Sequence, residues 1–125
     1  MAKWGELSPK SRGDWGEAQV AEYLRERGYT IVASQYRCRF GEIDLIARDG
    51  GMLCFVEVKT RKNGDLGLPR EYVTAAKQRK LRTTASHYLS ARDPDTPCRF
   101  DVAEVYPNEE ESPDKARIIY LENAF

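Results

Sequence analysis

Two short apolar runs around Asp49-Gly50-Gly51 constrain this 125-residue chain more than any other feature. Residues 41–48 and 52–59 are both rich in β-branched or apolar side chains, as strands are. Paired glycines between two such runs are typical of a tight β-hairpin. The chain is therefore expected to build its fold around two neighbouring central strands.

A two-residue turn at Gly50-Gly51 sets the register of this hairpin and gathers charged residues. Asp44 then lies opposite Glu57, and Glu42 lies opposite Lys59, all four on one sheet face. Directly opposed residues have Cβ atoms about 5 Å apart, where like charges repel each other. A divalent cation such as Mg²⁺, or the Lys59 ammonium, would compensate the two acids.

Two alternatives weaken this interpretation. A turn shifted to Asp49-Gly50 would place Phe55 opposite Asp44. A one-sided sheet would expose the acidic face to water, but Phe55 and its apolar neighbours Ile46 and Leu53 would then be exposed together, which soluble surfaces usually avoid. The opposite face is expected to be apolar or small, from Ile43, Leu45, Ala47, Cys54, Val56 and Val58.

Length and composition are typical of one globular domain, with 41% hydrophobic and 32% charged residues. We expect a flexible tail at residues 1–12 and a single domain at residues 13–125. No apolar run approaches the roughly 20 residues of a membrane span, and no secretory signal is evident, so a cytoplasmic protein without membrane contact is expected. The unpaired spacing of Cys38, Cys54 and Cys98 favours reduced thiols over a disulfide or zinc site.

The twenty basic and twenty acidic residues cancel, but their distribution is uneven. From Arg61 to Arg82 there are seven basic residues and two acidic ones, a local net charge of +5. This stretch directly follows the acidic hairpin, as is wanted where an anionic backbone is held against a metal site. Any single one of these side chains is as readily explained by a solvated helix face. The candidate nucleic-acid contacts are Arg61, Lys62, Lys77, Arg79, Lys80 and Arg82.

Two helices are predicted. Asp14 and Glu17 have the spacing of a capping box, so a first helix is expected from Asp14 to Gly28, its C-terminal cap. Glu17 shares the apolar stripe of this helix, where it either caps the first turn or supplies a further acid to the hairpin. The other members of that stripe are Val20, Ala21 and Leu24.

A glycine-rich loop at residues 62–68 is expected at the rim of the site, and Pro69 suits the first turn of a second helix that continues to about Ala91. Lys77 falls within the apolar stripe of this helix, and it either extends outward to solvent or reaches the acidic end of the sheet. The stripe consists of Val73, Ala76, Leu81, Ala85, Tyr88 and Leu89.

Further strands are expected at residues 29–39, 99–106 and 116–122. Asp101 is interpreted as a structural residue paired with an arginine. The resulting order is helix, three strands, helix, strand, strand. The predicted fold class is therefore α/β, with a mixed central sheet of about five strands flanked by helices.

Two carboxylates and a lysine suit phosphodiester hydrolysis. Asp44, Glu57 and the backbone carbonyl of Val58 would hold one or two cations that polarise a phosphate and activate a water. Lys59 would orient that water or offset the charge of the transition state. Paired carboxylates also hydrolyse glycosides, but the adjacent basic surface favours phosphate substrates.

These residues resemble the PD-(D/E)XK nuclease superfamily, which has a restriction-endonuclease-like core. The fuller blocks at residues 41–47, 55–61, 77–79 and 99–102 look like the uncharacterised bacterial YraN-like family, which is similar to archaeal Holliday junction resolvases. The resemblance covers about residues 13–106. Ile43 replaces the proline of the superfamily's name and leaves the acids intact.

The resemblance implies a Mg²⁺- or Mn²⁺-dependent nuclease site at Asp44, Glu57 and Lys59, with Glu17 matching the first-helix acid of resolvase-like members. Branched, flapped or single-stranded DNA is the implied substrate, and a homodimer is implied because resolvase-like relatives bind two-fold junctions. The YraN-like family has no settled activity. A nucleic-acid-binding module or assembly subunit that keeps the nuclease fold without turnover is therefore the alternative.

Overall fold

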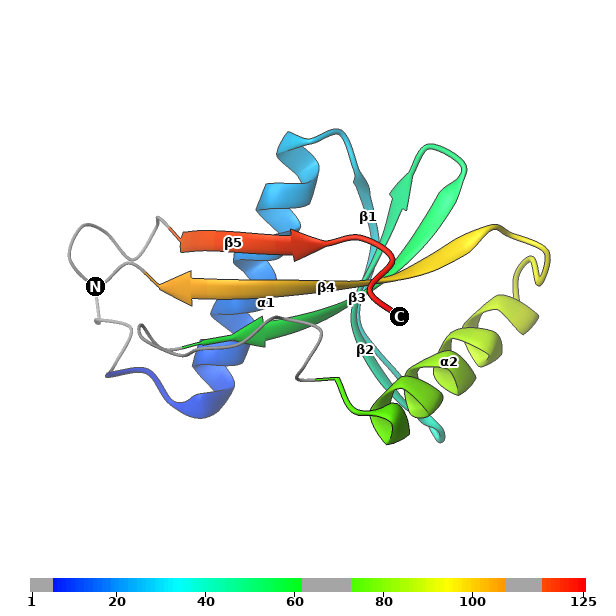
Figure 1. The fold of residues 1–125 in the computed structure, drawn as a ribbon, viewed down its shortest axis with the longest axis horizontal. Coiled ribbons are helices and arrows are strands. Elements are labelled where there is room, and N and C mark those ends of the chain that lie inside the picture. Colours follow the sequence, from blue (N-terminus) through cyan, green and yellow to red (C-terminus); the bar gives the residue numbers. More distant parts are fainter. Residues whose placement is uncertain (1–5, 62–72, 108–115) are drawn as a thin grey trace.

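The computed structural model describes residues 6–61, 73–107 and 116–125 (Figure 1). The helices in these ranges are α1 (Pro9–Glu26) and α2 (Ala75–Ser90), and the strands are β1 (Thr30–Cys38), β2 (Gly41–Asp49), β3 (Met52–Thr60), β4 (Cys98–Pro107) and β5 (Ala116–Leu121). This order confirms the predicted α/β fold. Within the same ranges, no helix combines the length and the apolar character that crossing a membrane requires.

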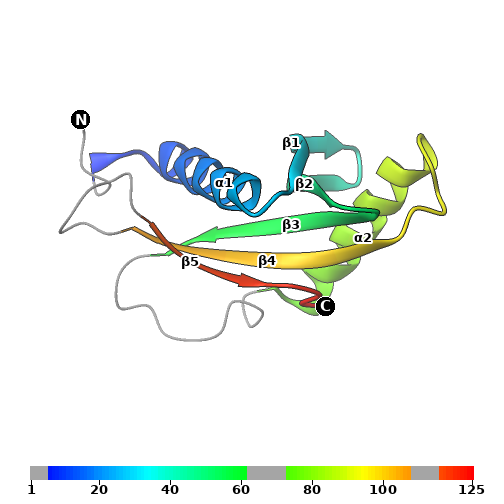
Figure 2. The same cartoon turned by 90° about the horizontal axis from the view of Figure 1, so that it is seen from above.

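The described strands form a five-stranded mixed sheet in the order β1-β2-β3-β4-β5. Neighbouring strands are antiparallel except β3 and β4, which are parallel. A parallel pair needs a long crossover, and α2 lies in the connection between these two strands. Figure 2 shows α1 lying along one side of β3 and β4.

The hairpin between β2 and β3 has the register that the sequence predicts. Asp49 pairs with Met52, so Gly50-Gly51 form the two-residue turn. Gly50 has a φ of 59°, which belongs to the left-handed region that glycine adopts without strain. The ladder then continues from Asp49–Met52 to Leu45–Val56.

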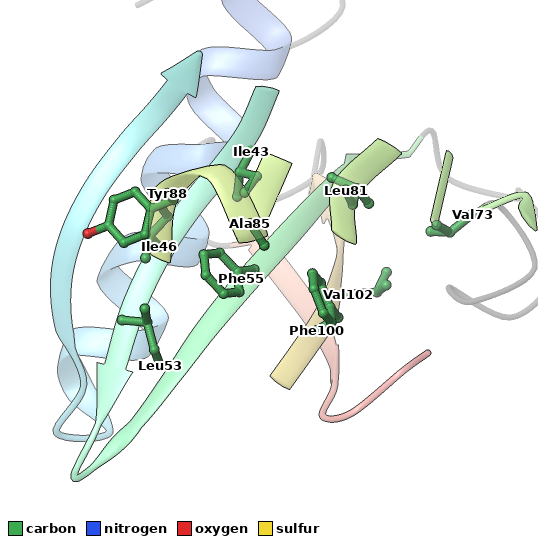
Figure 3. Close-up of a cluster of buried hydrophobic side chains, with 10 residues drawn as sticks. All are labelled: Ile43, Ile46, Leu53, Phe55, Val73, Leu81, Ala85, Tyr88, Phe100 and Val102. Carbon is green, nitrogen blue, oxygen red and sulfur yellow. The ribbon is translucent and has the colours of Figure 1, made fainter. Parts of the chain in front are cut away.

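Two apolar clusters cover the two faces of the sheet. The α2 cluster, drawn in Figure 3, joins α2 to the sheet through Ile43, Ile46, Leu53, Phe55, Val73, Leu81, Ala85, Tyr88, Phe100 and Val102. The α1 cluster contains Val20, Ala21, Leu24, Leu45, Ala47, Cys54, Val56, Ala103 and Val105. The prediction that Ile43 shares a face with Leu45 is therefore wrong. The alternation of sides in β2 breaks between these two residues, just where the ladder with β3 stops.

Helix α1 begins earlier than predicted. The Ser8 side chain accepts a hydrogen bond from the Ser11 N–H at 3.1 Å, and Pro9 occupies the first turn, so the cap is Ser8 and not Asp14. Residues 9–12, assigned to the tail by sequence, are helical. The predicted end is correct, because Gly28 follows the helix with a φ of 88°.

Gly16 lets α1 approach β3 closely. The residue is buried, and a Cβ atom at this position would collide with the side chain of Thr60. Gly13, one turn earlier, has open space where its Cβ would lie. The close approach at Gly16 fixes the first half of α1, including Glu17, against the end of β3.

Helix α2 begins later than predicted. It starts at Ala75, where the Thr74 hydroxyl accepts a backbone N–H of the first turn at 3.1 Å, so Val73 precedes the helix. Ala76, predicted to be in the core, is exposed, and Thr84 is buried in its place. The Thr84 hydroxyl donates to a backbone carbonyl one turn earlier at 2.8 Å, which allows this polar residue to be buried.

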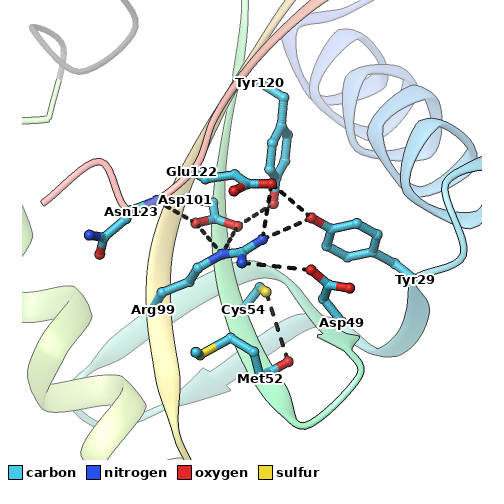
Figure 4. A network of polar contacts seen from close by, with 9 residues as sticks. All are labelled: Tyr29, Asp49, Met52, Cys54, Arg99, Asp101, Tyr120, Glu122 and Asn123. Carbon is cyan, nitrogen blue, oxygen red and sulfur yellow. Dashed lines mark hydrogen bonds and ion pairs between the residues drawn. The ribbon is translucent and has the colours of Figure 1, made fainter.

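The predicted partnership of Asp101 with an arginine is confirmed (Figure 4). Arg99 Nε donates to both carboxylate oxygens of the fully buried Asp101, at 3.0 and 3.1 Å. Asp101 also accepts the Tyr120 hydroxyl at 2.6 Å and the Asn123 N–H at 2.8 Å. This network satisfies the buried carboxylate and ties β4 to β5 and the segment that follows it.

Candidate functional site

The site lies where β2 and β3 part. Beyond the Leu45–Val56 pair, the Val58 N–H donates to Oδ2 of Asp44 at 2.8 Å. The Asp44 carboxylate thus accepts a hydrogen bond from a strand N–H in the part of the hairpin where the ladder of paired residues has ended. This hydrogen bond holds the Asp44 carboxyl between the two strands.

Asp44 is surrounded by other acids. Burial and, next, the charge of Glu57 raise the pKa of Asp44 to about 8, against an ordinary 3.8. The charge of Glu17 and a hydrogen bond with its carboxyl raise this pKa further, while the Val58 N–H opposes the shift. A group with this pKa carries a proton for much of the time at neutral pH. The proton allows the two carboxyl groups of Asp44 and Glu17 to share a hydrogen bond.

A cavity of about 360 Å³ opens beside these acids. It is lined by Pro9, Arg12, Gly13, Glu17, Asp44, Val58 and Thr60. Its walls come from the first turns of α1 and from the ends of β2 and β3 that carry the acids. The carboxyl groups of Asp44 and Glu17 are therefore accessible to small ligands from the α1 side of the sheet.

Glu57 lies towards α2 and is paired with two lysines. Its side chain is 6% exposed, and its Oε1 lies 2.6 Å from Lys77 Nζ and 3.6 Å from Lys59 Nζ. Burial, aided by the Lys77 charge, lowers the pKa of Lys59, and Glu57 opposes that shift. Burial alone would lower the pKa of Lys77, but the hydrogen bond and charge of Glu57 raise it. Lys77 therefore reaches the acidic end of the sheet, which is the second of the two alternatives left open by the sequence.

Asp44 and Glu57 thus contact different helices, although the sequence predicted that they face each other directly. Glu57 affects Asp44 electrostatically, as expected for the opposed pair, but Asp44 meets α1 through Glu17 and Glu57 meets α2 through Lys77. Neither of the predicted pairs, Asp44–Glu57 and Glu42–Lys59, belongs to the ladder, which ends at Leu45–Val56. Glu42 instead accepts from Arg37 Nε of β1 at 3.0 Å. The predicted pairs assumed that the ladder continues along the whole hairpin, whereas β2 and β3 diverge beyond Leu45–Val56.

Gln35 is a site residue that sequence reasoning missed. Its Nε2 donates to Asp14 Oδ1 at 3.0 Å and to Glu17 Oε2 at 2.9 Å. Its φ of 51° is in the left-handed region, which is costly for a residue with a long side chain. A glutamine within a strand carries no sequence signal for this conformation, so only the structure reveals its contact with Glu17.

The cation that the sequence predicts needs oxygen ligands from the acidic residues of the site. Among the residues described, no three His, Cys, Asp or Glu side chains gather closely enough to hold a metal ion by themselves. Mg²⁺ is usually bound by one or two carboxylates, with water completing its shell. Asp44 and Glu57 could supply these one or two carboxylates. The charge of Glu57 disfavours ionisation of Asp44, and a bound cation would offset that repulsion. A metal role for the Val58 carbonyl stays a prediction.

The predicted nucleic-acid contacts are in different situations. Arg79, Lys80 and Arg82 are exposed on α2, and Arg82 lies over the rings of Phe100 and Phe125 at 5.1 and 5.5 Å. Lys62 and the predicted rim loop at residues 62–68 lie outside the described residues.

Arg61 is joined to an acid that sequence reasoning did not single out. Its Nε lies 2.8 Å from Oε1 of Glu104, a fully buried residue on β4. The same oxygen accepts the Tyr106 hydroxyl at 3.1 Å, and β4 places Glu104 beside Lys59 of β3. Arg61 is thus held against the sheet next to the candidate site.

Comparison with known proteins identifies close relatives. The model of the uncharacterised protein family UPF0102 matches residues 16–105, a range that holds Glu17, Asp44, Glu57, Lys59 and Lys77. A UPF0102 protein of Symbiobacterium thermophilum is 52% identical over 115 residues, covering 90% of this chain and 94% of the relative. One from Lachnoclostridium phytofermentans is 49% identical over 121 residues, covering 95% and 96%, and one from Alkaliphilus metalliredigens is 42% identical over 117 residues, covering 93% and 98%.

Proposed function

The chain belongs to the uncharacterised protein family UPF0102, and we propose that it is a metal-dependent nuclease that hydrolyses phosphodiester bonds of DNA. One observation carries the proposal: burial and then the charge of Glu57, on the adjacent strand, raise the pKa of Asp44 beside a cavity, and two lysines lie beside Glu57. An acid that has a perturbed pKa and faces a cavity, as Asp44 does, is typical of catalytic sites. The mixed sheet between two helices agrees with the restriction-endonuclease-like core of the PD-(D/E)XK superfamily.

Asp44 and Glu57 would hold Mg²⁺ or Mn²⁺, which when bound polarises the scissile phosphate and lowers the pKa of a water. Lys59 lies 3.6 Å from Glu57 and is one-quarter exposed, so its ammonium can reach a phosphate oxygen near the carboxylate. Its lowered pKa favours a role in proton transfer as well as in charge stabilisation.

Glu17 has a separate role in this proposal. It shares a hydrogen bond with the Asp44 carboxyl, so it lies beside the proton that Asp44 must lose before it can bind a cation. Gln35 fixes Glu17 for this purpose through its 2.9 Å hydrogen bond. Glu17 thus faces the same cavity as Asp44, next to the group that must lose its proton.

The second candidate is a binding module without turnover. Lys77 favours it, because its ammonium lies 2.6 Å from Glu57 and already neutralises this carboxylate. A cation at Glu57 must displace or weaken that ion pair. If the ion pair is too stable, the protein would bind nucleic acid through its lysines and would not cleave it.

Cleavage of labelled linear, flapped, single-stranded and four-way DNAs tests the proposal. Each substrate is incubated with Mg²⁺, with Mn²⁺ or with chelator. Metal-dependent cutting is expected from the wild type and from Asp49→Asn, an exposed acid on the same strand, but not from Asp44→Asn. Equal cutting by Asp44→Asn would contradict a catalytic role of Asp44, and binding without cutting by the wild type would favour the binding module.

A further inference from the structure

A second cavity, of about 450 Å³, lies on the α2 side of the candidate site. It is lined by Gly41, Glu42, Ala76, Lys77, Lys80, Leu81 and Thr84, and we call it the α2 groove. Lys77 connects it to the site, because the same side chain reaches Glu57 at 2.6 Å. A ligand in this groove would therefore lie beside the candidate catalytic carboxylate.

An exposed aromatic residue lies at the other end of the groove. Phe40, in the turn before Gly41, is 37% exposed, and its ring centroid lies 5.4 Å from that of His87 on α2. The guanidinium of Arg39 lies 4.8 Å from the Phe40 ring centroid. An exposed ring next to a guanidinium is a surface on which nucleobases stack.

Gly41 allows this turn to approach α2. Its φ is 150°, and an added Cβ would lie 3.0 Å from the Thr84 hydroxyl. A larger residue at this position would push the turn away from the helix. The tight contact therefore keeps Phe40 in line with the groove.

The groove follows one face of α2. Lys77, Lys80, Thr84 and His87 are three or four residues apart, so they share that face. At a rise of 1.5 Å per residue, the path from Lys77 to His87 is roughly 15 Å, the length of about four stacked nucleotides. The one acid along the described lining, Glu42, is paired with Arg37 at 3.0 Å, so its charge does not oppose an anion strongly.

We propose that the α2 groove binds a single-stranded segment of nucleic acid and leads it to Glu57, with a base stacked on Phe40 and phosphates held by Lys77 and Lys80. The bases of a duplex are paired and stacked inside it, so they are not available to Phe40, whereas those of a single strand are. This inference rests on the proposed function for the cleavage that follows. The binding step itself does not require a metal.

Fluorescence anisotropy of labelled oligonucleotides with the full chain in chelator tests this binding step. The probes are single strands of DNA and of RNA of about 12 nucleotides and a DNA duplex of the same sequence. Phe40→Ala should bind the single strands about 5- to 100-fold more weakly, whereas Phe40→Trp should retain binding. Ile119→Ala removes an apolar side chain of similar exposure, 40%, from β5 and should bind as the wild type does.

The salt dependence gives a second readout. Lys80→Ala should reduce the slope of log affinity against log salt by about 0.7 for single strands, because one phosphate contact is lost. Lys10→Ala, an exposed lysine on α1, should leave the slope unchanged. Single-strand binding that is indifferent to Phe40, or as sensitive to Ile119 as to Phe40, would overturn the groove assignment.

The outcomes separate this inference from the proposed function. Phe40-dependent binding in chelator supports the groove even if no substrate is cleaved. Metal-dependent cleavage with Phe40-independent binding overturns the groove and leaves the nuclease standing. The more tightly bound of the DNA and RNA strands identifies the sugar that the groove accepts.

Discussion

The Lys77 ammonium lies 2.6 Å from the Glu57 carboxylate, across the interface between α2 and β3. Lys77 thus occupies one of the oxygens that a metal ion at the proposed site would use. The same lysine lines the α2 groove, where a phosphate can attract it. We infer that substrate phosphate and metal ion act together: the phosphate takes Lys77 away from Glu57, and the carboxylate becomes free for the cation.

Removal of Lys77 should therefore strengthen metal binding in the absence of substrate. In Lys77→Met, Glu57 keeps only the more distant Lys59 at 3.6 Å, and its carboxylate is freer to bind a cation. We expect about tenfold tighter Mn²⁺ binding by calorimetry, since a hydrogen bond between charged groups contributes about 1.5–3 kcal/mol. Lys80→Met, one turn further along α2, is the matched control. Weaker Mn²⁺ binding in Lys77→Met would show that the ion pair supports the metal site.

Asp44→Asn should stabilise the protein in a pH-dependent way. The folded state keeps the Asp44 proton up to a pKa of about 8, whereas the unfolded chain loses it near 3.8. Asp44 therefore contributes its whole stabilisation of the folded state below the pKa of the unfolded chain, 3.8, and this contribution declines as the pH rises towards 8. The decline is at most about 1.4 kcal/mol per pH unit, and Asp44→Asn lacks it.

The measurement is urea unfolding of both proteins in chelator across that pH window. The advantage of Asp44→Asn should grow with pH and level off above about pH 8. Asp49→Asn, at an exposed position, should show no such trend. A difference that is constant with pH would mean that Asp44 is ionised throughout, and the proton shared with Glu17 would be ruled out.

Gln35 is expected to act as a positioning residue. Gln35→Asn tolerates the left-handed backbone better and keeps the amide, but it is one methylene too short to hold Glu17. We expect kcat for cleavage to fall about tenfold, KM to change little and the acidic limb of the pH–rate profile to move, because the proton balance of Glu17 and Asp44 changes.

A control at the other left-handed non-glycine residue of the described chain isolates backbone strain. Asn123 has the same φ of 51° and lies in the Asp101 network, away from the acids. Asn123→Gly should leave the pH–rate profile unchanged. If Gln35→Asn alters only the melting temperature, then Gln35 supports the fold and not the site.

Gly16→Ala should destabilise the protein, because the added methyl group collides with Thr60. Overpacking of this kind costs about 1–3 kcal/mol. Gly13→Ala, with open space at the added atom, should instead stabilise α1 by up to about 1 kcal/mol through helix propensity. Thermal unfolding of the two variants checks this contrast, and equal effects would contradict the close approach of α1 to β3.

Local patterns predict much of this fold. Period-two alternation and the Gly50-Gly51 turn specify the hairpin register, because a one-residue slip would reverse every buried side chain. The stripe of Val20, Ala21 and Leu24 likewise predicts the buried face of α1, with Glu17 at its edge. These signals are carried by neighbouring residues, so they can be read without tertiary information.

The errors arise where tertiary contacts override local patterns. Ser8 caps α1 and Thr74 caps α2, but Asp14 and Pro69 are equally plausible helix starts by sequence. The parting of β2 and β3 moves Ile43 to the α2 cluster and turns Asp44 towards Glu17. No periodic pattern encodes that divergence, nor the strained conformation of Gln35, because both depend on segments distant in the chain.

Cleavage and thermal stability measured together on Asp44→Asn and Glu57→Gln test the central claim most directly. Both variants should lose Mn²⁺-dependent cleavage of a flapped DNA. Their stabilities should differ: Asp44→Asn removes repulsion and should melt higher, whereas Glu57→Gln leaves Lys59 and Lys77 without their shared carboxylate and should melt lower. Cleavage retained in either variant, at a rate near that of the wild type, would contradict the proposal that these two carboxylates form the catalytic site.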